Sequence, residues 1–132
     1  MSVTISGVAA NLWLDNFGAL FPGTTGKLRI YTGTSPGAGN SATGTLLVDI
    51  TLPASPWNGA TSRTISKNGT WSTASATASG EAGYYRLSNS AAGSNHVDGT
   101  VTVTGGGGDL TLDTVDIVAG QPVTINTFTY SI

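Results

Sequence analysis

Cysteine is absent from the sequence, so disulfide bonds and thiolate metal sites are excluded. Charged residues make up only 9% of the chain, where about 25% is typical of globular domains. No run of about 18 apolar residues occurs, so no membrane-spanning helix is predicted. The first residues, MSVTISG, lack the basic region and apolar core of a secretory signal. We therefore expect a protein that is made in a cytoplasm and has no membrane partner.

Basic residues are also few, and they do not cluster along the chain. The formal net charge is −2, and the sequence has only five lysines and arginines. Binding to nucleic acid requires clustered cations that neutralise phosphates. The sequence therefore argues against a nucleic-acid partner.

Glycine, serine and threonine take the places that charged residues usually fill, with 19 glycines in the chain. Threonine suits a pleated surface because its branched Cβ packs well there. The apolar positions alternate along the chain, which a disordered segment would have no reason to do. This composition indicates a β-protein whose surface makes repeated contacts with neighbours, outside a cell or on a particle.

The stretch from Gly80 to Val103 has the clearest β-pattern and predicts the centre of the fold. Tyr85 and Leu87 alternate with polar neighbours, and a second alternating run follows a turn at 90–95. A period of two predicts a β-hairpin with one set of side chains in the core and the other set towards solvent.

One helix is predicted near the N-terminus. Ser6 can cap its start, and Pro22 with Gly23 ends it. We expect the apolar stripe of this helix to lie in the core; its members are Ala10, Trp13, Leu14, Phe17 and Phe21.

The remaining runs predict short strands separated by turns. The segment 33–44 is a polar loop with nothing to bury, and Asn68-Gly69 is a strong turn signal between two short runs. The phase of alternation shifts by one residue between Ile125 and Phe128, which requires a bulge or a passage between sheets. The predicted fold is all-β: a β-sandwich or jelly roll of about eight short antiparallel strands with one N-terminal helix. Residues 1–7 form an arm, and residues 8–132 form a single domain.

Catalytic and metal-binding patterns are weak. His96 is the single histidine, and Asp98 shares its strand face, but no nucleophile elbow accompanies them. Asp109, Asp113 and Asp116 follow a four-glycine run without the spacing of known calcium loops. We predict no catalytic residues, no cofactor and no metal, and read these side chains as hairpin and turn residues.

The order of several short motifs resembles the small virion proteins of tailed bacteriophages, of the head-decoration or cement type. The motifs are LRIYTG at 28–33, GTLL at 44–47, AGYYRL at 82–87, DGTV at 98–101, AGQPVTI at 119–125 and FTY at 128–130. The resemblance covers the chain from about Val8 onward. It implies a β-sandwich or jelly-roll protein without catalysis that binds the outside of the capsid and staples neighbouring subunits of the major capsid protein, often as a dimer or trimer.

The expected contact surface combines the N-terminal arm with the polar loop and a loop tryptophan. Its residues are Met1, Ser2, Val3, Thr4, Ile5, Pro36 and Trp57. An arm can add a strand to the sheet of a neighbour. The expected location is the capsid exterior, after synthesis in the host bacterial cytoplasm.

Two other functions remain open at this point. One is a structural component of the phage tail or baseplate. The other is a carbohydrate-binding surface module, because Trp57 and Trp71 could stack on sugar rings if they were exposed. Loop tryptophans also cap the ends of sandwiches, which is an equally good interpretation of Trp57.

Overall fold

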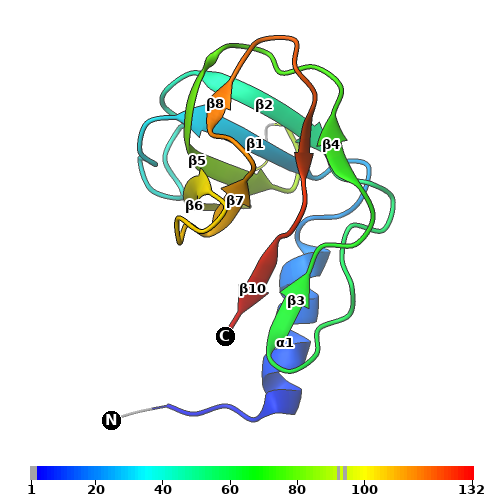
Figure 1. Cartoon of the computed structure of the whole chain (residues 1–132). Coiled ribbons are helices and arrows are strands. Elements are labelled where there is room, and N and C mark those ends of the chain that lie inside the picture. The colour runs from blue at the N-terminus through cyan, green and yellow to red at the C-terminus, as the bar shows by residue number, and fades with distance from the viewer. Residues whose placement is uncertain (1–2, 92, 94) are drawn as a thin grey trace.

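The protein is described here by a computed structural model that covers residues 3–91, 93 and 95–132. It is mostly β-structure with one short helix, as the sequence predicts at this coarser level. The described residues contain ten strands rather than about eight (Figure 1). The elements are α1 (Gly7–Ala19), β1 (Lys27–Thr32), β2 (Leu46–Thr51), β3 (Thr64–Ser66), β4 (Trp71–Thr73), β5 (Gly80–Ser88), β6 (His96–Val103), β7 (Leu110–Leu112), β8 (Asp116–Ile117), β9 (Val123–Ile125) and β10 (Thr129–Ser131).

Six strands form one curled sheet in the order β2-β1-β5-β6-β7, with β8 pairing separately with β5. The predicted hairpin of β5 and β6 is confirmed as an antiparallel pair. The expectation of purely antiparallel pairing is wrong, because β7 runs parallel to β6. The four-glycine run makes this short return possible: Gly105 and Gly107 adopt positive φ, which other residues rarely do.

A register shift between β1 and β2 changes which side chains face the core. Ile30 pairs with Val48, but Tyr31 pairs with Leu46, so Leu47 is the extra residue of an irregular pairing. Leu47 and Val48 are therefore both fully buried, although they are consecutive. Leu46 is only half-buried, so strict alternation of buried residues along β2 holds only from Val48 onward.

The Asn68-Gly69 turn forms, with Gly69 at φ 72°, but the strands on either side of it do not pair with each other. Instead β3 pairs with β10 and β4 pairs with β9. The end of the chain thus passes from one two-stranded sheet to another. This passage explains the one-residue phase change predicted between Ile125 and Phe128.

The helix is confirmed, and its cap is as predicted. The Ser6 hydroxyl accepts a hydrogen bond from the backbone N–H of Ala9 at 3.2 Å. Gly18 lets α1 approach β3, since a Cβ at this position would collide with Ile65. Among the described residues, no helix has both the length and the apolarity needed to cross a membrane.

Most of the predicted helical stripe is buried, but Trp13 is not. Ala10, Leu14 and Phe21 are at most 1% exposed, whereas Trp13 is 59% exposed. Trp13 lies at the edge of the stripe and is exposed, like Leu12 beside it. The prediction that Trp13 lies in the core is therefore wrong.

A single apolar cluster fills the interior of the curled sheet and extends to β4 and β9. Trp71 is fully buried there, with its ring 5.0 Å from that of Trp57 and 5.5 Å from that of Phe128. Phe17 of α1 stacks on Tyr130 of β10 at 4.5 Å. These aromatic contacts join the α1, β3 and β10 end of the molecule to the sheet.

Candidate functional site

A row of four charged residues crosses the sheet. Asp49 of β2 pairs with Arg29 of β1, Arg29 pairs with Arg86 of β5, and Arg86 pairs with Asp98 of β6. Residues that are directly opposite each other on adjacent strands share one face of a sheet. The structure thus places two arginines side by side, with one carboxylate on the outer side of each.

Arg86 and Asp98 form the stronger of the two ion pairs. Arg86 Nε lies 2.7 Å from Asp98 Oδ1, and Nη2 lies 2.9 Å from Oδ2. Their side chains are 9% and 5% exposed. Burial alone would raise the pKa of Asp98, but the hydrogen bonds from Arg86 and Ser35 outweigh it and hold this pKa below its ordinary value of 3.8.

Arg29 is less completely neutralised than Arg86. Its Nη2 lies 3.3 Å from Asp49 Oδ2, and the same carboxylate lies 3.7 Å from Lys27 Nζ. One carboxylate is therefore shared by two cations. Burial lowers the pKa of Arg29, but the contacts with Asp49 and Tyr31 more than offset it, so the guanidinium stays charged.

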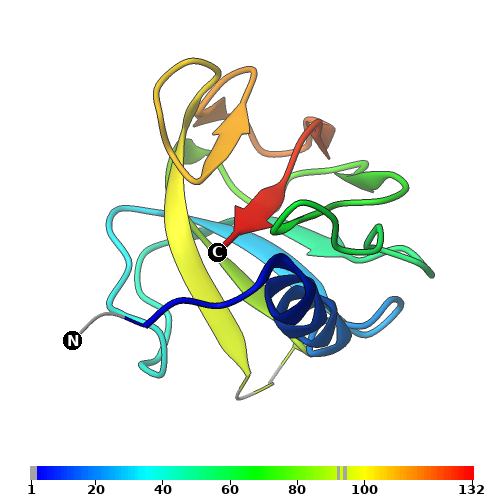
Figure 2. The ribbon, with the colours of Figure 1, turned by 90° about the horizontal axis from the view of Figure 1, so that it is seen from below.

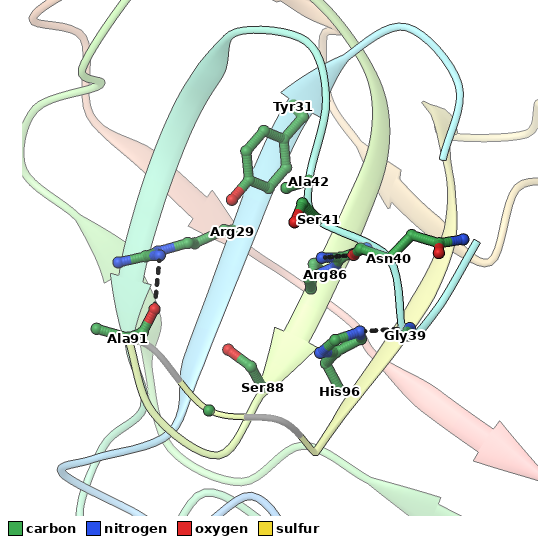
Figure 3. A pocket seen from close by; sticks show the side chains of 11 residues that line it. Arg29, Tyr31, Gly39, Asn40, Ser41, Ala42, Arg86, Ser88, Ala91 and His96 are labelled. Atoms are coloured by element: carbon green, nitrogen blue, oxygen red, sulfur yellow. Dashed lines mark hydrogen bonds between the residues drawn. The ribbon is translucent and has the colours of Figure 1, made fainter. Parts of the chain in front are cut away.

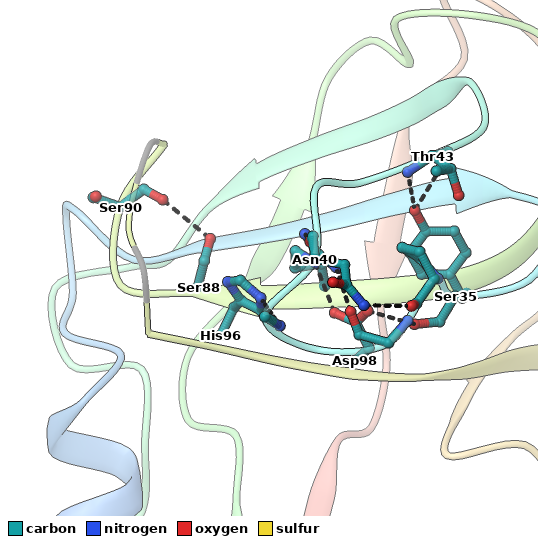
Figure 4. A network of polar contacts seen from close by, with 12 residues as sticks. Ser35, Asn40, Thr43, Ser88, Ser90, His96 and Asp98 are labelled. Atoms are coloured by element: carbon teal, nitrogen blue, oxygen red, sulfur yellow. Dashed lines mark hydrogen bonds and ion pairs between the residues drawn. The ribbon is translucent and has the colours of Figure 1, made fainter.

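The loop 33–44 covers this face of the sheet, contrary to the expectation that it has nothing to bury (Figure 4). The Tyr84 hydroxyl accepts from the Thr43 N–H at 3.1 Å and donates to the Thr43 carbonyl at 2.6 Å. Arg86 Nη1 donates to the Asn40 carbonyl at 2.7 Å. The alternate side chains of β5 are therefore buried, and the prediction that they face solvent is wrong; they are Tyr84, Arg86 and Ser88.

Between this loop and the strands lies a cavity of about 370 Å³, which we call the arginine pocket (Figure 3). The side chains that matter here come from β1, the loop, β5 and β6: Arg29, Tyr31, Ser41, Arg86, Ser88 and His96. Ala91 and Gly93 lie on its rim, and the Ala91 carbonyl accepts from Arg29 Nη1 at 3.2 Å. The pocket offers several hydrogen-bonding groups around two cations.

The His96 side chain is hydrogen-bonded to the loop 33–44 and not to an acidic or nucleophilic side chain. Its Nε2 accepts from the Gly39 N–H at 2.6 Å, which leaves the imidazole proton on Nδ1. Asp98 is hydrogen-bonded to Arg86 and Ser35 instead of His96. The paired His96 and Asp98 that the sequence allowed therefore does not form.

The three aspartates after the glycine run have separate roles. Asp109 accepts from the backbone N–H of Thr100 at 3.0 Å, and Asp113 accepts from Asn126 at 3.3 Å. Asp116 lies in β8 and pairs with Glu81 through the backbone. Within the part of the chain that the structure describes, no three acidic or histidine side chains come together as metal ligands.

A second candidate surface is the α1 face, formed by Val8, Leu12, Trp13 and Leu20. These apolar side chains are 74%, 59%, 59% and 47% exposed. With 3.6 residues per turn, Val8, Leu12 and Trp13 fall outside the buried stripe, with Trp13 at its edge, and Leu20 follows as the C-cap of the helix. Figure 2 shows α1 end-on, with the N-terminal arm and the C-terminal strand beside it.

The expected interface residues lie in three parts of the fold. Met1 and Ser2 are outside the described residues; Val3 and Thr4 are exposed, and the Ile5 carbonyl accepts from Arg63 Nη1 at 2.8 Å. The Pro36 carbonyl accepts from Asn40 within the loop.

Trp57 is half-buried, and its Nε1 donates to the Phe21 carbonyl at 3.0 Å. Its ring packs edge-on against Phe17 and Trp71. Trp57 is thus largely engaged inside the molecule.

Comparison of the chain with protein-family models, curated proteins and solved structures finds no match. The arginine pocket was not predicted from the sequence. One feature of the sequence does indicate it. Arg29 is two residues from Tyr31 in one predicted strand, and Arg86 is two residues from Tyr84 in another, so each arginine shares a strand face with a tyrosine.

Proposed function

We propose that the protein is a non-enzymatic virion structural protein of the head-decoration, or cement, type of tailed bacteriophages. It binds the outside of the capsid lattice and stabilises it by bridging neighbouring subunits of the major capsid protein. The observation that carries this proposal is the α1 face, where Val8, Leu12 and Trp13 lie exposed on the helix and Leu20 lies exposed at its C-cap. Large apolar side chains that lie exposed together are typical of interaction sites.

The α1 face can supply binding energy when a partner covers it. Full burial of a valine or leucine side chain contributes about 1.5–3 kcal/mol, and these residues retain much of that contribution because they are largely exposed. Val3, in the arm that leads into α1, is a further exposed apolar side chain, at 79%. A single site of this size is weak, but copies that bridge several subunits gain avidity.

The proposal includes self-association as a dimer or trimer, since a symmetric oligomer presents several α1 faces to a symmetric lattice. It also includes the finer fold description, a β-sandwich or jelly roll. In support of that description, the curled sheet and the β4–β9 pair enclose one common core. A structural place in the tail or baseplate is the nearest alternative, because the same apolar face would serve there.

Cosedimentation with capsids that lack the protein tests the proposal. We expect saturable binding of the wild-type protein and reduced binding of a variant that carries Leu12→Ser and Trp13→Ser. Val118→Ser is the matched control, because Val118 is also 59% exposed but lies outside the α1 face, directly after β8. Binding that is absent in the wild type, or equally weakened by the control, would contradict the proposal.

Deletion of residues 1–4 distinguishes the contribution of the arm to capsid binding from that of α1. It retains Ile5, whose carbonyl is bonded to Arg63, so the start of α1 keeps its contact with the C-terminal end of the chain. We expect this deletion to weaken capsid binding less than the double substitution in α1. An unchanged capsid occupancy would remove the arm from the proposed interface.

A further inference from the structure

We propose that the arginine pocket binds a single sugar unit that carries a carboxylate. The inference goes beyond the capsid role and does not depend on it, since the pocket and the α1 face belong to different elements. It starts from the charge row across the sheet. Like charges directly opposite each other on adjacent strands are destabilising, yet Arg29 and Arg86 are placed in this way.

The local charge balance favours an anion at this place. Arg29 and Arg86 face Asp49 and Asp98, so the row of four is neutral, and Lys27 beside Asp49 brings the local net charge to +1. The chain as a whole carries −2. Three of its five basic residues are thus gathered on one face of the sheet.

Arg29 is the residue best suited to hold the anion. Asp98 accepts two short hydrogen bonds from Arg86, whereas Asp49 is shared between Lys27 and Arg29 at 3.7 and 3.3 Å. The Arg29 side chain is also more exposed than that of Arg86, at 22% against 9%. A guanidinium group binds a carboxylate through two parallel N–H donors, and Arg29 is the arginine with donors to spare.

The groups around Arg29 suit hydroxyls. Figure 3 shows Tyr31, Ser41 and Ser88 around the cavity, with His96 on the side opposite Arg29. Serine and tyrosine hydroxyls both donate and accept, and the protonated Nδ1 of His96 is a donor. A ring that bears several hydroxyls can use these groups while its carboxylate contacts Arg29.

The volume and the lining of the cavity narrow the class of ligand that fits it. Its volume of about 370 Å³ is near the lower end for small-molecule pockets, which suits one sugar ring. Phosphate sites are commonly built from backbone amides at a helix N-terminus. This pocket is instead built from side chains on the face of a sheet, so we favour a carboxylate over a phosphate.

An NMR titration of the full chain with sodium D-glucuronate tests the inference. D-glucose supplies the same ring without the carboxylate, and inorganic phosphate supplies an anion without the ring. Arg29→Gln removes the proposed anion contact, and Ser41→Trp fills the cavity from an exposed loop position. Lys67→Gln is the matched control, because it also removes one cation but lies outside the pocket, beside Gly69.

We expect saturable shifts at amides of β1, β5 and β6 with a dissociation constant in the millimolar range, about 1–10 mM. Arg29→Gln and Ser41→Trp should each weaken binding at least about tenfold, and Lys67→Gln should not change it. D-glucose should bind too weakly to saturate.

The inference would be overturned by the absence of saturable shifts with glucuronate, by shifts centred outside the pocket, or by equal binding of the Arg29→Gln and Lys67→Gln variants. Phosphate binding as tightly as glucuronate would also overturn it, because the ring would then contribute nothing. If Arg29→Gln does not fold, Ser41→Trp decides the matter, since loss of binding in that folded variant supports the pocket and retained binding refutes it. Capsid cosedimentation is read out independently, so failure here leaves the proposed structural role standing.

Discussion

Arg86 and Asp98 lie directly opposite each other on β5 and β6 and are joined by two parallel hydrogen bonds. Arg86 also donates to the carbonyls of Asn40 and Gly37, so the same side chain ties the loop 33–44 to the sheet. Asp98 accepts a third hydrogen bond, from Ser35 of this loop. One buried ion pair thus fixes both the strand pair and the loop that forms one wall of the arginine pocket.

Removing one member of this pair should destabilise the protein strongly. Asp98→Ala leaves a buried guanidinium without its counter-ion, for which we expect a loss of about 3–5 kcal/mol in the free energy of unfolding. Asp49→Ala is the matched comparison, because it removes the other carboxylate of the same row. Its pairs are longer and more exposed, so we expect a loss of about 0–1 kcal/mol. Urea unfolding of both variants measures the difference, and equal losses would refute the unequal roles of the two pairs.

The same pair predicts a loss of stability in acid. The pKa of Asp98 is lower in the folded protein than its ordinary value of 3.8, so folding favours the ionised form. This contribution is fully present above the unfolded pKa and is lost as the pH falls through the lower, folded pKa. Thermal unfolding from about pH 6 down to about pH 2 should show a steeper decline for the wild type than for Asp98→Asn. Parallel declines in the two proteins would contradict the assignment.

Gly99 should resist substitution although its φ is unexceptional. It lies opposite Tyr85 in the β5–β6 register, and a Cβ at this position would collide with the Tyr85 ring. The ring is buried against Phe128, 5.4 Å away, and has little room to move. We expect Gly99→Ala to cost about 1–3 kcal/mol. Gly59→Ala, where no atom lies within 4 Å of the added Cβ, should leave the unfolding midpoint nearly unchanged.

The Tyr84 hydroxyl should control the order of the loop 33–44. Tyr84→Phe removes both hydrogen bonds to Thr43 and keeps the stack of rings with Tyr31 at 5.1 Å. We expect a loss of about 1–2 kcal/mol and faster hydrogen exchange at the Thr43 amide. The amide of Leu28 in the centre of the sheet serves as the internal reference. Unchanged exchange at Thr43 would show that other contacts hold the loop.

The local part of the fold could be predicted from the sequence, because it depends on neighbouring residues. Ser6 and Pro22 bound the helix, and alternation marks β1 and the β5–β6 hairpin. Partners distant in sequence could not be predicted in this way. Thus β3 and β4, on either side of one turn, each pair with a strand from the end of the chain.

The candidate surfaces escaped prediction for a related reason. The alternation in β5 predicts that Arg86 faces solvent. In the structure the loop 33–44, more than forty positions earlier in the chain, covers it. The spacing of Trp13 fits the apolar stripe and so predicts a core residue, but its side chain is 59% exposed in the structure. Burial on the outer face of a sheet and on the flank of a helix depends on what the rest of the chain places there.

The most direct test of the proposed structural role is to image capsids after incubation with the purified protein. We predict added density at regular lattice points on the outer surface, with α1 and the N-terminal arm turned towards the capsid subunits and the arginine pocket left open. Density confined to the tail, contact through a different face of the protein, or bare capsids at saturating protein concentration would contradict it.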